Sequence, residues 1–241
     1  NRVWQHHFGQ PLVENPSDFG LRTKQPVHHE LLDYLATTLI KNAWHTKPLH
    51  RLIMTSAAYQ RASQIDETDQ LQKQLESDPS NNIVWHANRR RLDLEQMRDT
   101  MLAISGKLDD RLYGRPGSIT DINNQRRTIY SFVERQNIPN VVATFDFANA
   151  DTSTAQRVNT IVPQQSLYAM NSEFVAKTAK AVAALASAGS DLERATRIYQ
   201  SVLRRSPTSE EADLALEFVG TNPWHQFAQI LLMTNELMFI D

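Results

Sequence analysis

Apolar residues recur at helical spacing in two stretches of the N-terminal quarter of the chain. The first stretch predicts a helix over about residues 30–41, with an apolar stripe at Leu32, Leu35, Ala36 and Leu39. The second predicts a helix with Thr46 as N-cap, Pro48 in its first turn and a buried face at Leu49, Leu52, Ile53 and Ala57. The pattern therefore indicates an N-terminal helical pair.

Residues 63–88 are polar, which predicts a surface excursion with one short helix. The segment that follows has the strongest helical pattern in the chain, with an apolar side at Leu94, Met97, Met101 and Ile104. Gly106 stands where a left-handed residue commonly ends such a helix.

The middle of the chain is less regular. Glycine and proline predict a loop over 107–118, and alternating β-branched and aromatic residues over 128–133 predict a strand or extended segment. The stretch from Asn140 to Arg157 fits both helix and strand, and we interpret it as a short helix followed by a loop.

Four helices are predicted in the C-terminal third. The first begins at Asn171 or Ser172 and ends at Gly189, and the second stops before Ser206-Pro207. The third has a capping box of Thr208 and Glu211 and is closed by Gly220, and the fourth runs from Asn222-Pro223 to about Glu236.

These elements predict a mainly α fold: a helical domain with a C-terminal antiparallel helix bundle and a small irregular or β element in the middle. We interpret residues 1–241 as one domain, which can be subdivided into 1–62, 63–88, 89–165 and 166–241.

Composition narrows the function. With 25 Lys and Arg against 27 Asp and Glu, the chain has no overall charge that favours nucleic acid. The absence of cysteine excludes disulfides, zinc–cysteine sites, thiol nucleophiles and covalent haem attachment in this sequence. No glycine-rich phosphate loop and no apolar run long enough to span a membrane is present.

The N-terminal quarter holds a first group of candidate residues: His6, His7, Asp18, His28 and His50. Histidine is the usual acid–base group near neutral pH and a common metal ligand, so this group could form a catalytic or metal cluster. We favour the alternative that these imidazoles cap helices and fill a polar interface. His29 and Asp33 resemble an HExxH zinc motif only superficially, because Asp33 stands where that motif has its second histidine.

A second group lies in the run of residues 89–99. On a continuous helix Arg91, Glu95 and Arg98 would share one flank with Asp99 beside them, as a ladder of alternating charge. Such a ladder could bind an anion or supply half of an acid–base pair. We favour an ion-pair network that holds the helix to a neighbour.

A third group occupies the middle region and consists of Arg126, Arg127, Asp146, Asp151 and Arg157. Loop residues on a rigid scaffold often carry function, and two carboxylates near arginines could serve a glycoside or ester hydrolase. The simpler interpretation pairs Asp146 with an arginine. No GxSxG nucleophile motif is present.

Several longer motifs occur in a characteristic order: "NRVWQHHFGQPLVENPSDFG", "HHELLDYLA", "LHRLIMTSAAY", "RRRLDLEQMRD", "RRTIYSFV", "FDFANAD" and "QQSLYAMN". With these motifs the whole chain resembles the domain of unknown function at the C-terminal end of large planctomycete proteins with upstream cytochrome c-like domains. The resemblance implies that the opening motif is part of the domain and that the parent is exported and binds haem upstream.

The resemblance also implies a set of family positions: Arg2, Trp4, His6, His7, Asp18, Phe19, Gly20, His28, Arg51, Arg91, Glu95, Arg98, Asp99, Arg127, Asp146 and Arg157. Two departures weaken parts of it. His29 stands where the family usually has proline, and "FDFANADTST" lacks the usual proline and cysteine of that loop.

We therefore expect a non-catalytic interaction module, without a cofactor or metal of its own, in a periplasmic or otherwise extracytoplasmic protein. Its expected partners are the preceding domains of the same polypeptide or another exported protein, not nucleic acid, and without membrane insertion. The alternative is an enzyme of hydrolase type, with or without a metal, that acts on a carbohydrate or related polymer through the His, Asp and Arg residues. A purely structural spacer is a third possibility.

Overall fold

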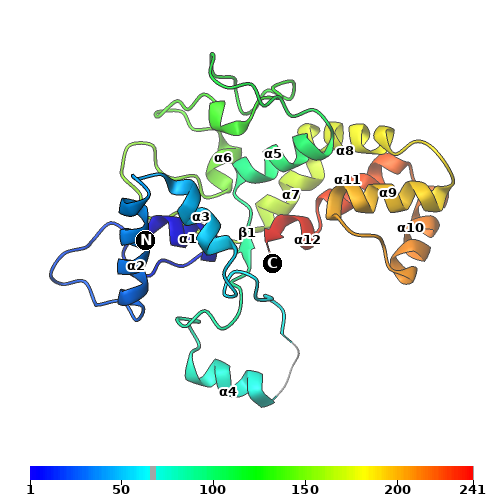
Figure 1. The fold of residues 1–241 in the computed structure, drawn as a ribbon. Helices are drawn as coiled ribbons and strands as arrows, with labels where there is room; N and C mark the ends of the chain where they lie inside the picture. Colours follow the sequence, from blue (N-terminus) through cyan, green and yellow to red (C-terminus); the bar gives the residue numbers. More distant parts are fainter. Residues whose placement is uncertain (66–68, 241) are drawn as a thin grey trace. The chain divides into compact units, whose positions relative to one another are not determined.

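The computed structural model describes residues 1–65 and 69–240, and helices dominate it (Figure 1). The chain separates into two compact units, unit 1 (Asn1–Arg90) and unit 2 (Arg91–Ile240). The division falls inside the arginine run 89–91. The predicted mainly α fold class is confirmed.

Unit 1 is built on a small helical core. Its helices are α1 (Arg2–Phe8), α2 (His29–Lys41), α3 (Thr46–Met54) and α4 (Asp69–Ser77). The buried core residues are Trp4, Phe8, Leu35, Leu49, Ile53 and Val84. The predicted pair α2 and α3 is confirmed. Part of the predicted polar excursion, residues 66–68, lies outside the described residues.

Two details of the second predicted helix were wrong. Its N-cap is His45 rather than Thr46, and Ala57 is exposed beyond the helix end. The helix stops early because the hydroxyls of Thr55 and Ser56 donate to carbonyls of the last turn, at 2.9 and 2.6 Å. Hydroxyl side chains compete in this way with the backbone hydrogen bonds of a helix.

Helix α1 was not predicted by the apolar pattern, and local contacts hold both of its ends. Asn1 exchanges two hydrogen bonds with the backbone of Val13, at 2.9 and 3.2 Å. At the other end Gly9 adopts φ 78°, and a Cβ there would lie 2.7 Å from Cδ of Arg90. Only glycine fits this close approach without displacing the arginine.

Unit 2 contains the larger core, of 22 buried apolar residues. The unit begins at the second residue of β1 (Arg90–Arg91). Its further elements are α5 (Leu94–Ile104), the 3₁₀ turn η1 (Thr128–Tyr130), α6 (Asn140–Thr144), α7 (Pro163–Asn171), α8 (Glu173–Leu185), α9 (Asp191–Leu203), α10 (Ser209–Thr221), α11 (Trp224–Leu232), α12 (Asn235–Met238) and β2 (Phe239–Ile240).

Helix α8 packs against α5, α7, α9 and α11, and Figure 1 shows it in yellow. It is almost an alanine and valine helix on its buried side, which allows its neighbours to approach closely. The predicted C-terminal helix bundle is confirmed. Where the chain enters unit 2, the segment from Arg91 pairs with β2, and the Leu92 N–H donates to the Met238 carbonyl at 2.8 Å.

The bundle helices end at positions other than those predicted. Helix α8 ends at Leu185, before Gly189, and Arg194 and Arg197 of α9 donate to the carbonyls of Ala183 and Ala186 at its end. These side chains satisfy carbonyls that a helix terminus leaves free.

The last two predicted helices also differ from the structure. Gly220 lies inside α10, which ends at Thr221 because Pro223 forces Asn222 into an extended conformation. The final predicted helix is two helices, since the Thr234 hydroxyl donates to the Leu231 carbonyl at 2.8 Å and Thr234 begins α12. The capping box of Thr208 and Glu211 forms as predicted.

The predicted strand over 128–133 was wrong at its start, where η1 forms instead. Both the N–H and the hydroxyl of Thr128 donate to Oδ1 of Asp99, at 2.7 and 2.6 Å. Because its N–H is bonded to Asp99, Thr128 cannot donate to a neighbouring β-strand. The β-bridges in this region, Asp109 with Arg126 and Gly117 with Ser131, are isolated ones. The short helix at Asn140 and the loop after it are confirmed as α6 and residues 145–162.

Candidate functional site

The histidines of unit 1 meet in one pair. Helix α1 brings His7 against α3, where His7 Nε2 lies 2.8 Å from His50 Nδ1. The edge of Tyr59 completes the contact, with its ring centroid 5.5 Å from that of His7. On the same helix, the rings of Trp4 and Phe8 stack with their centroids 4.0 Å apart, and both side chains belong to the core of unit 1.

His7 is held in its neutral form. Partial burial lowers the pKa of His7, and the positive charges that His50, Arg90 and His6 can carry lower it further. One of the two facing nitrogens must carry the shared proton and the other must accept it, which requires a neutral acceptor ring. The pair is therefore intact near neutral pH.

The remaining candidates of the first group do not join this pair. His6 is exposed, and its backbone carbonyl accepts a bond from Arg90 at 2.7 Å. The carboxylate of Asp18 accepts the Gly20 N–H at 2.9 Å on an exposed turn. Among the described residues, no group of three or more histidine or carboxylate side chains is arranged to hold a metal ion.

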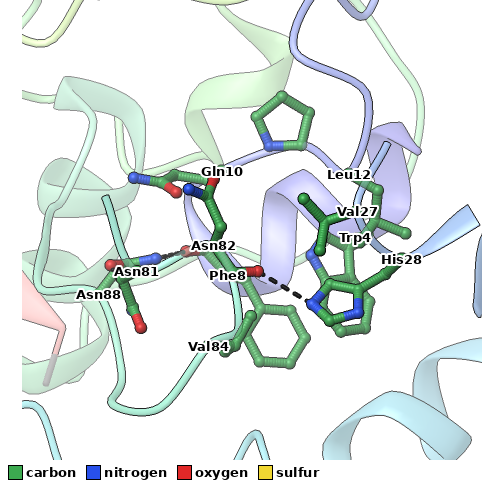
Figure 2. Close-up of a pocket in the computed structure, with 11 residues that line it drawn as sticks. Trp4, Phe8, Gln10, Leu12, Val27, His28, Asn81, Asn82, Val84 and Asn88 are labelled. Atoms are coloured by element: carbon green, nitrogen blue, oxygen red, sulfur yellow. Dashed lines mark hydrogen bonds between the residues drawn. The ribbon is translucent and has the colours of Figure 1, made fainter. Parts of the chain in front are cut away.

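His28 belongs to a separate polar pocket of about 50 Å³ in unit 1, drawn in Figure 2. The pocket is lined by Trp4, Phe8, Gln10, Pro11, Leu12, Val27, His28, Asn81, Asn82, Val84 and Asn88. Figure 2 shows His28 beside Trp4 and Val27, with Gln10 and the asparagines across from them. An aromatic surface thus faces several amide groups.

Two asparagines build the wall of this pocket. The buried side chain of Asn81 donates to His86 O at 2.9 Å and to Asn88 Oδ1 at 3.0 Å, and it accepts the Trp85 N–H. Asn88 then donates to the Phe8 carbonyl at 3.0 Å. This chain of bonds fixes the loop that precedes Arg90 against α1.

Other groups of the pocket keep hydrogen-bonding capacity. His28 Nε2 lies 3.0 Å from the Asn82 carbonyl, and because a carbonyl only accepts, this nitrogen carries the proton. Nδ1 of His28 makes no hydrogen bond to any of the described residues. Gln10 is exposed and its side-chain amide makes no hydrogen bond within the described part of the chain.

In unit 2, Arg91 and Asp146 form an ion pair with 2.9 Å between Nη2 and Oδ2. Asp146 also accepts the N–H and hydroxyl of Thr160, at 2.9 and 2.6 Å. Arg91 donates further to the Thr160 carbonyl and to Gln165, which itself donates to the Thr144 carbonyl. Burial opposes ionisation of Asp146, but these hydrogen bonds outweigh burial and hold its pKa below the usual value.

Glu95 of α5 forms a bidentate pair with Arg157, at 3.0 and 2.8 Å. The Arg157 guanidinium also lies over Phe147, with Cζ 5.0 Å from the ring centroid. Burial raises the pKa of Glu95, but the bonds from Arg157 outweigh this and lower it overall. The pair fixes the loop 145–162 to α5.

Arg98 and Asp99 hold a second loop on α5. The buried guanidinium of Arg98 donates to the Arg126 carbonyl at 3.0 Å, to Thr128 Oγ1 at 3.1 Å and to the Asn124 carbonyl. Asp99 accepts from Thr128 as described above. Both side chains are thereby committed to the loop that precedes η1.

Arg126 and Arg127 continue the same arrangement. The Arg127 side chain is half exposed, with Nε 3.8 Å from Asp99 Oδ2. Arg126 stacks on Tyr130 at 4.3 Å and donates to the carbonyls of Arg111, Tyr113 and Arg115. Arg98 and Arg126 therefore order segments that have few backbone hydrogen bonds of their own.

These contacts show that the residues of the predicted charged ladder do not share one flank of a helix. Arg91 lies in β1 rather than on the helix, Arg98 faces the core, and Glu95 pairs with Arg157 instead of a residue of α5. Asp151 is exposed, and its side chain makes no hydrogen bond within the described part of the chain. Asp146 is bonded to Arg91 and Thr160. The use of these two carboxylates in hydrolysis stays a prediction.

One feature of unit 2 has no counterpart in the sequence pattern: a cavity of about 150 Å³. It is lined by Arg91, Leu92, Met97, Phe145, Ile161, Gln165, Ser166, Ala169, Met233, Asn235, Met238 and Phe239. These residues come from four separate segments, so no local signal could have indicated it.

The geometry defines a helical protein of two units, with a polar pocket in unit 1 and arginine-ordered loops in unit 2. No described helix has the length and apolar character needed to cross a membrane. The model of the family PSD1, described as a protein of unknown function (DUF1553), matches residues 1–219. The chain therefore belongs to this family. No curated protein and no solved structure matches the chain.

Proposed function

We propose that the chain is a non-catalytic interaction module whose docking surface includes the polar pocket of unit 1. The observation that carries this proposal is the hydrogen-bonding capacity left in that pocket, at Gln10 and His28, beside exposed apolar side chains. Val27, which lines the pocket, is 68% exposed. Phe19 and Leu21, in the segment that leads to it, are exposed at 62% and 108%.

Exposed apolar groups next to unsatisfied polar groups are what an interface uses. Burial of the apolar side chains supplies affinity, and the polar groups select a partner with complementary donors and acceptors. Arg91, Arg98 and Arg157 of unit 2, by contrast, already have partners within their own unit. A docking role thus falls to unit 1.

The partner that we propose is the preceding part of the same polypeptide, or another exported protein. This rests on the resemblance to C-terminal domains of planctomycete proteins that carry upstream cytochrome c-like domains. On that proposal the module works outside the cytoplasm, binds no cofactor itself, and leaves haem chemistry to the upstream domains.

The test is a calorimetric titration of the purified chain with the haem-bearing upstream segment of its own polypeptide. We expect a complex that Val27→Asp weakens at least about 10-fold, since a carboxylate would be buried without a partner. Leu214→Asp is the matched control, because Leu214 is 66% exposed in unit 2. Absence of a complex at about 100 µM, or equal weakening by both variants, would contradict the proposal.

One observation favours a hydrolase as a second candidate function. The neutral His7, held against His50, has the protonation state of a general base. The check is the release of reducing ends from soluble polysaccharides, which this alternative expects to be lost in His7→Gln. Activity that survives His7→Gln, or no activity at all, removes His7 as the base.

A further inference from the structure

The cavity of unit 2 is a different kind of site from the unit 1 pocket. Its walls come from residues 91–97, from Phe145 after α6, from residues 161–169 and from residues 233–239. Most of its lining is apolar, as at Met97, Phe145, Ala169 and Met238. An apolar cavity of about 150 Å³ is large enough to hold a benzene ring and remains dry when empty. The space therefore suits one compact, largely apolar molecule.

Arg91 is the exception in this lining. Its side chain is only 10% exposed, and its guanidinium carbon lies 5.8 Å from the Phe145 ring centroid. The terminal nitrogens donate to Asp146, Thr160 and Gln165, but Nε is buried and has no hydrogen-bond partner among the described residues. Nε is enclosed by the protein's own atoms, as are the unpartnered Nε atoms of Arg98, Arg126 and Arg194, so Arg91 closes the wall of the cavity and offers no free donor to a ligand.

The charge of Arg91 is already balanced. Asp146 accepts from Arg91 and twice from Thr160, an arrangement that keeps this carboxylate ionised. An added carboxylate would face Asp146 as well as Arg91 and would lose its hydration in an apolar space. A neutral oxygen acceptor fits the site better than an anion.

The mouth of the cavity is polar. Ser166 and Asn235 line it, both are exposed, and neither side chain makes a hydrogen bond within the described part of the chain. Ile161, also in the lining, is 78% exposed. The apolar interior can thus be reached past small polar groups.

We propose that this cavity binds a compact uncharged molecule of about the size of one aromatic ring that carries a carbonyl or hydroxyl oxygen, which hydrogen-bonds to Ser166 and Asn235 at the mouth. Small aromatic ketones, aldehydes and alcohols have this chemistry. The site is separate from the docking surface of unit 1, so either proposal can fail without the other.

The test uses the full chain and three probes of similar shape: acetophenone, ethylbenzene and benzoate. Binding is measured by calorimetry and by shifts of the Ala169 methyl signal in NMR spectra. We expect acetophenone to bind at least about 10-fold more tightly than ethylbenzene, which lacks the oxygen, and than benzoate, which is charged. Equal binding of acetophenone and ethylbenzene, or no binding of any probe, overturns the proposal.

Two variants locate the site. Ala169→Leu fills the cavity, and Ser166→Tyr covers its mouth from an exposed position that leaves the core unchanged. We expect each to reduce acetophenone binding at least about 10-fold, while Ala184→Leu, on the exposed side of α8, leaves it unchanged. Binding that persists in Ser166→Tyr, which has no reason to unfold, places the ligand elsewhere and overturns the proposal.

Discussion

The two units use their polar side chains in different ways. In unit 1, asparagine and histidine side chains build a pocket and leave hydrogen-bonding capacity at its edge. In unit 2, arginine side chains such as Arg98 and Arg126 lie against loops and donate to backbone carbonyls. The comparison teaches that a charged cluster in a sequence can be structural, while less conspicuous amides form the surface that is open to a partner.

The difference has a physical cause in the loops of unit 2. Residues 105–127 and 145–162 contain no helix, so many of their carbonyls lack the partners that regular structure supplies. Arginine offers five donors in a rigid fork, which suits it to collect several carbonyls at once. In unit 1 asparagine shares this task with arginine, since Asn88 donates to the Phe8 carbonyl and Arg90 to the His6 carbonyl.

The largest effect that tests this contrast is expected for Arg98→Met. The substitution keeps the aliphatic stem but removes donors from two carbonyls and a hydroxyl, so we expect unit 2 to lose about 3 kcal/mol of unfolding free energy. Urea denaturation measures it, with Arg135→Met as an exposed control. A loss of less than about 1 kcal/mol would show that arginine does not hold the loop.

A smaller loss is expected for Glu95→Gln, which breaks the bidentate pair with Arg157. We expect about 1 kcal/mol at pH 7, because both side chains are partly exposed. The pKa of Glu95 is lowered in the fold, so its contribution is present above 4.5, its usual value, and is lost as pH falls below it. In thermal melts, the difference in stability between wild type and variant should therefore be smaller at pH 3 than at pH 7. A difference that is equal at both values contradicts this assignment.

Unit 1 should respond to acid through His7. Its pKa is lower in the fold than in the unfolded chain, so the unfolded state binds more protons as pH falls below 6.5, and stability declines there. Fluorescence melts between pH 7.5 and 5.5 can follow this, because Trp4, Trp44 and Trp85 belong to unit 1. We expect a flatter pH profile in His7→Gln but not in His225→Gln, and a profile unchanged by His7→Gln would refute this role.

The smallest effect is expected for metal. Since unit 1 brings together two histidines rather than three or more ligands, one equivalent of zinc should raise the melting temperature by less than about 1 °C. A larger, stoichiometric shift that is lost in His7→Ala or His28→Ala would show that histidines converge in solution. That result would indicate a metal site in unit 1 instead of a docking role.

The helices could be predicted because their signals are local. Periodic apolar residues identified α2, α3, α5 and the bundle, and the capping box at Thr208 placed the start of α10. A helix is decided by neighbours three and four residues apart, so the sequence alone carries enough information. The segment after Arg127 failed as a strand because Asp99, far away in the chain, captures Thr128.

The partners of the candidate residues were decided by tertiary structure alone. Arg91 and Asp146, or Glu95 and Arg157, are separated by long loops whose conformation no local pattern encodes. The sequence by itself determined that this chain is helical and that its histidines and arginines are worth locating. Only the fold decided which groups are bound to loops, which remain open in unit 1, and where a cavity forms in unit 2, because each depends on side chains from distant segments.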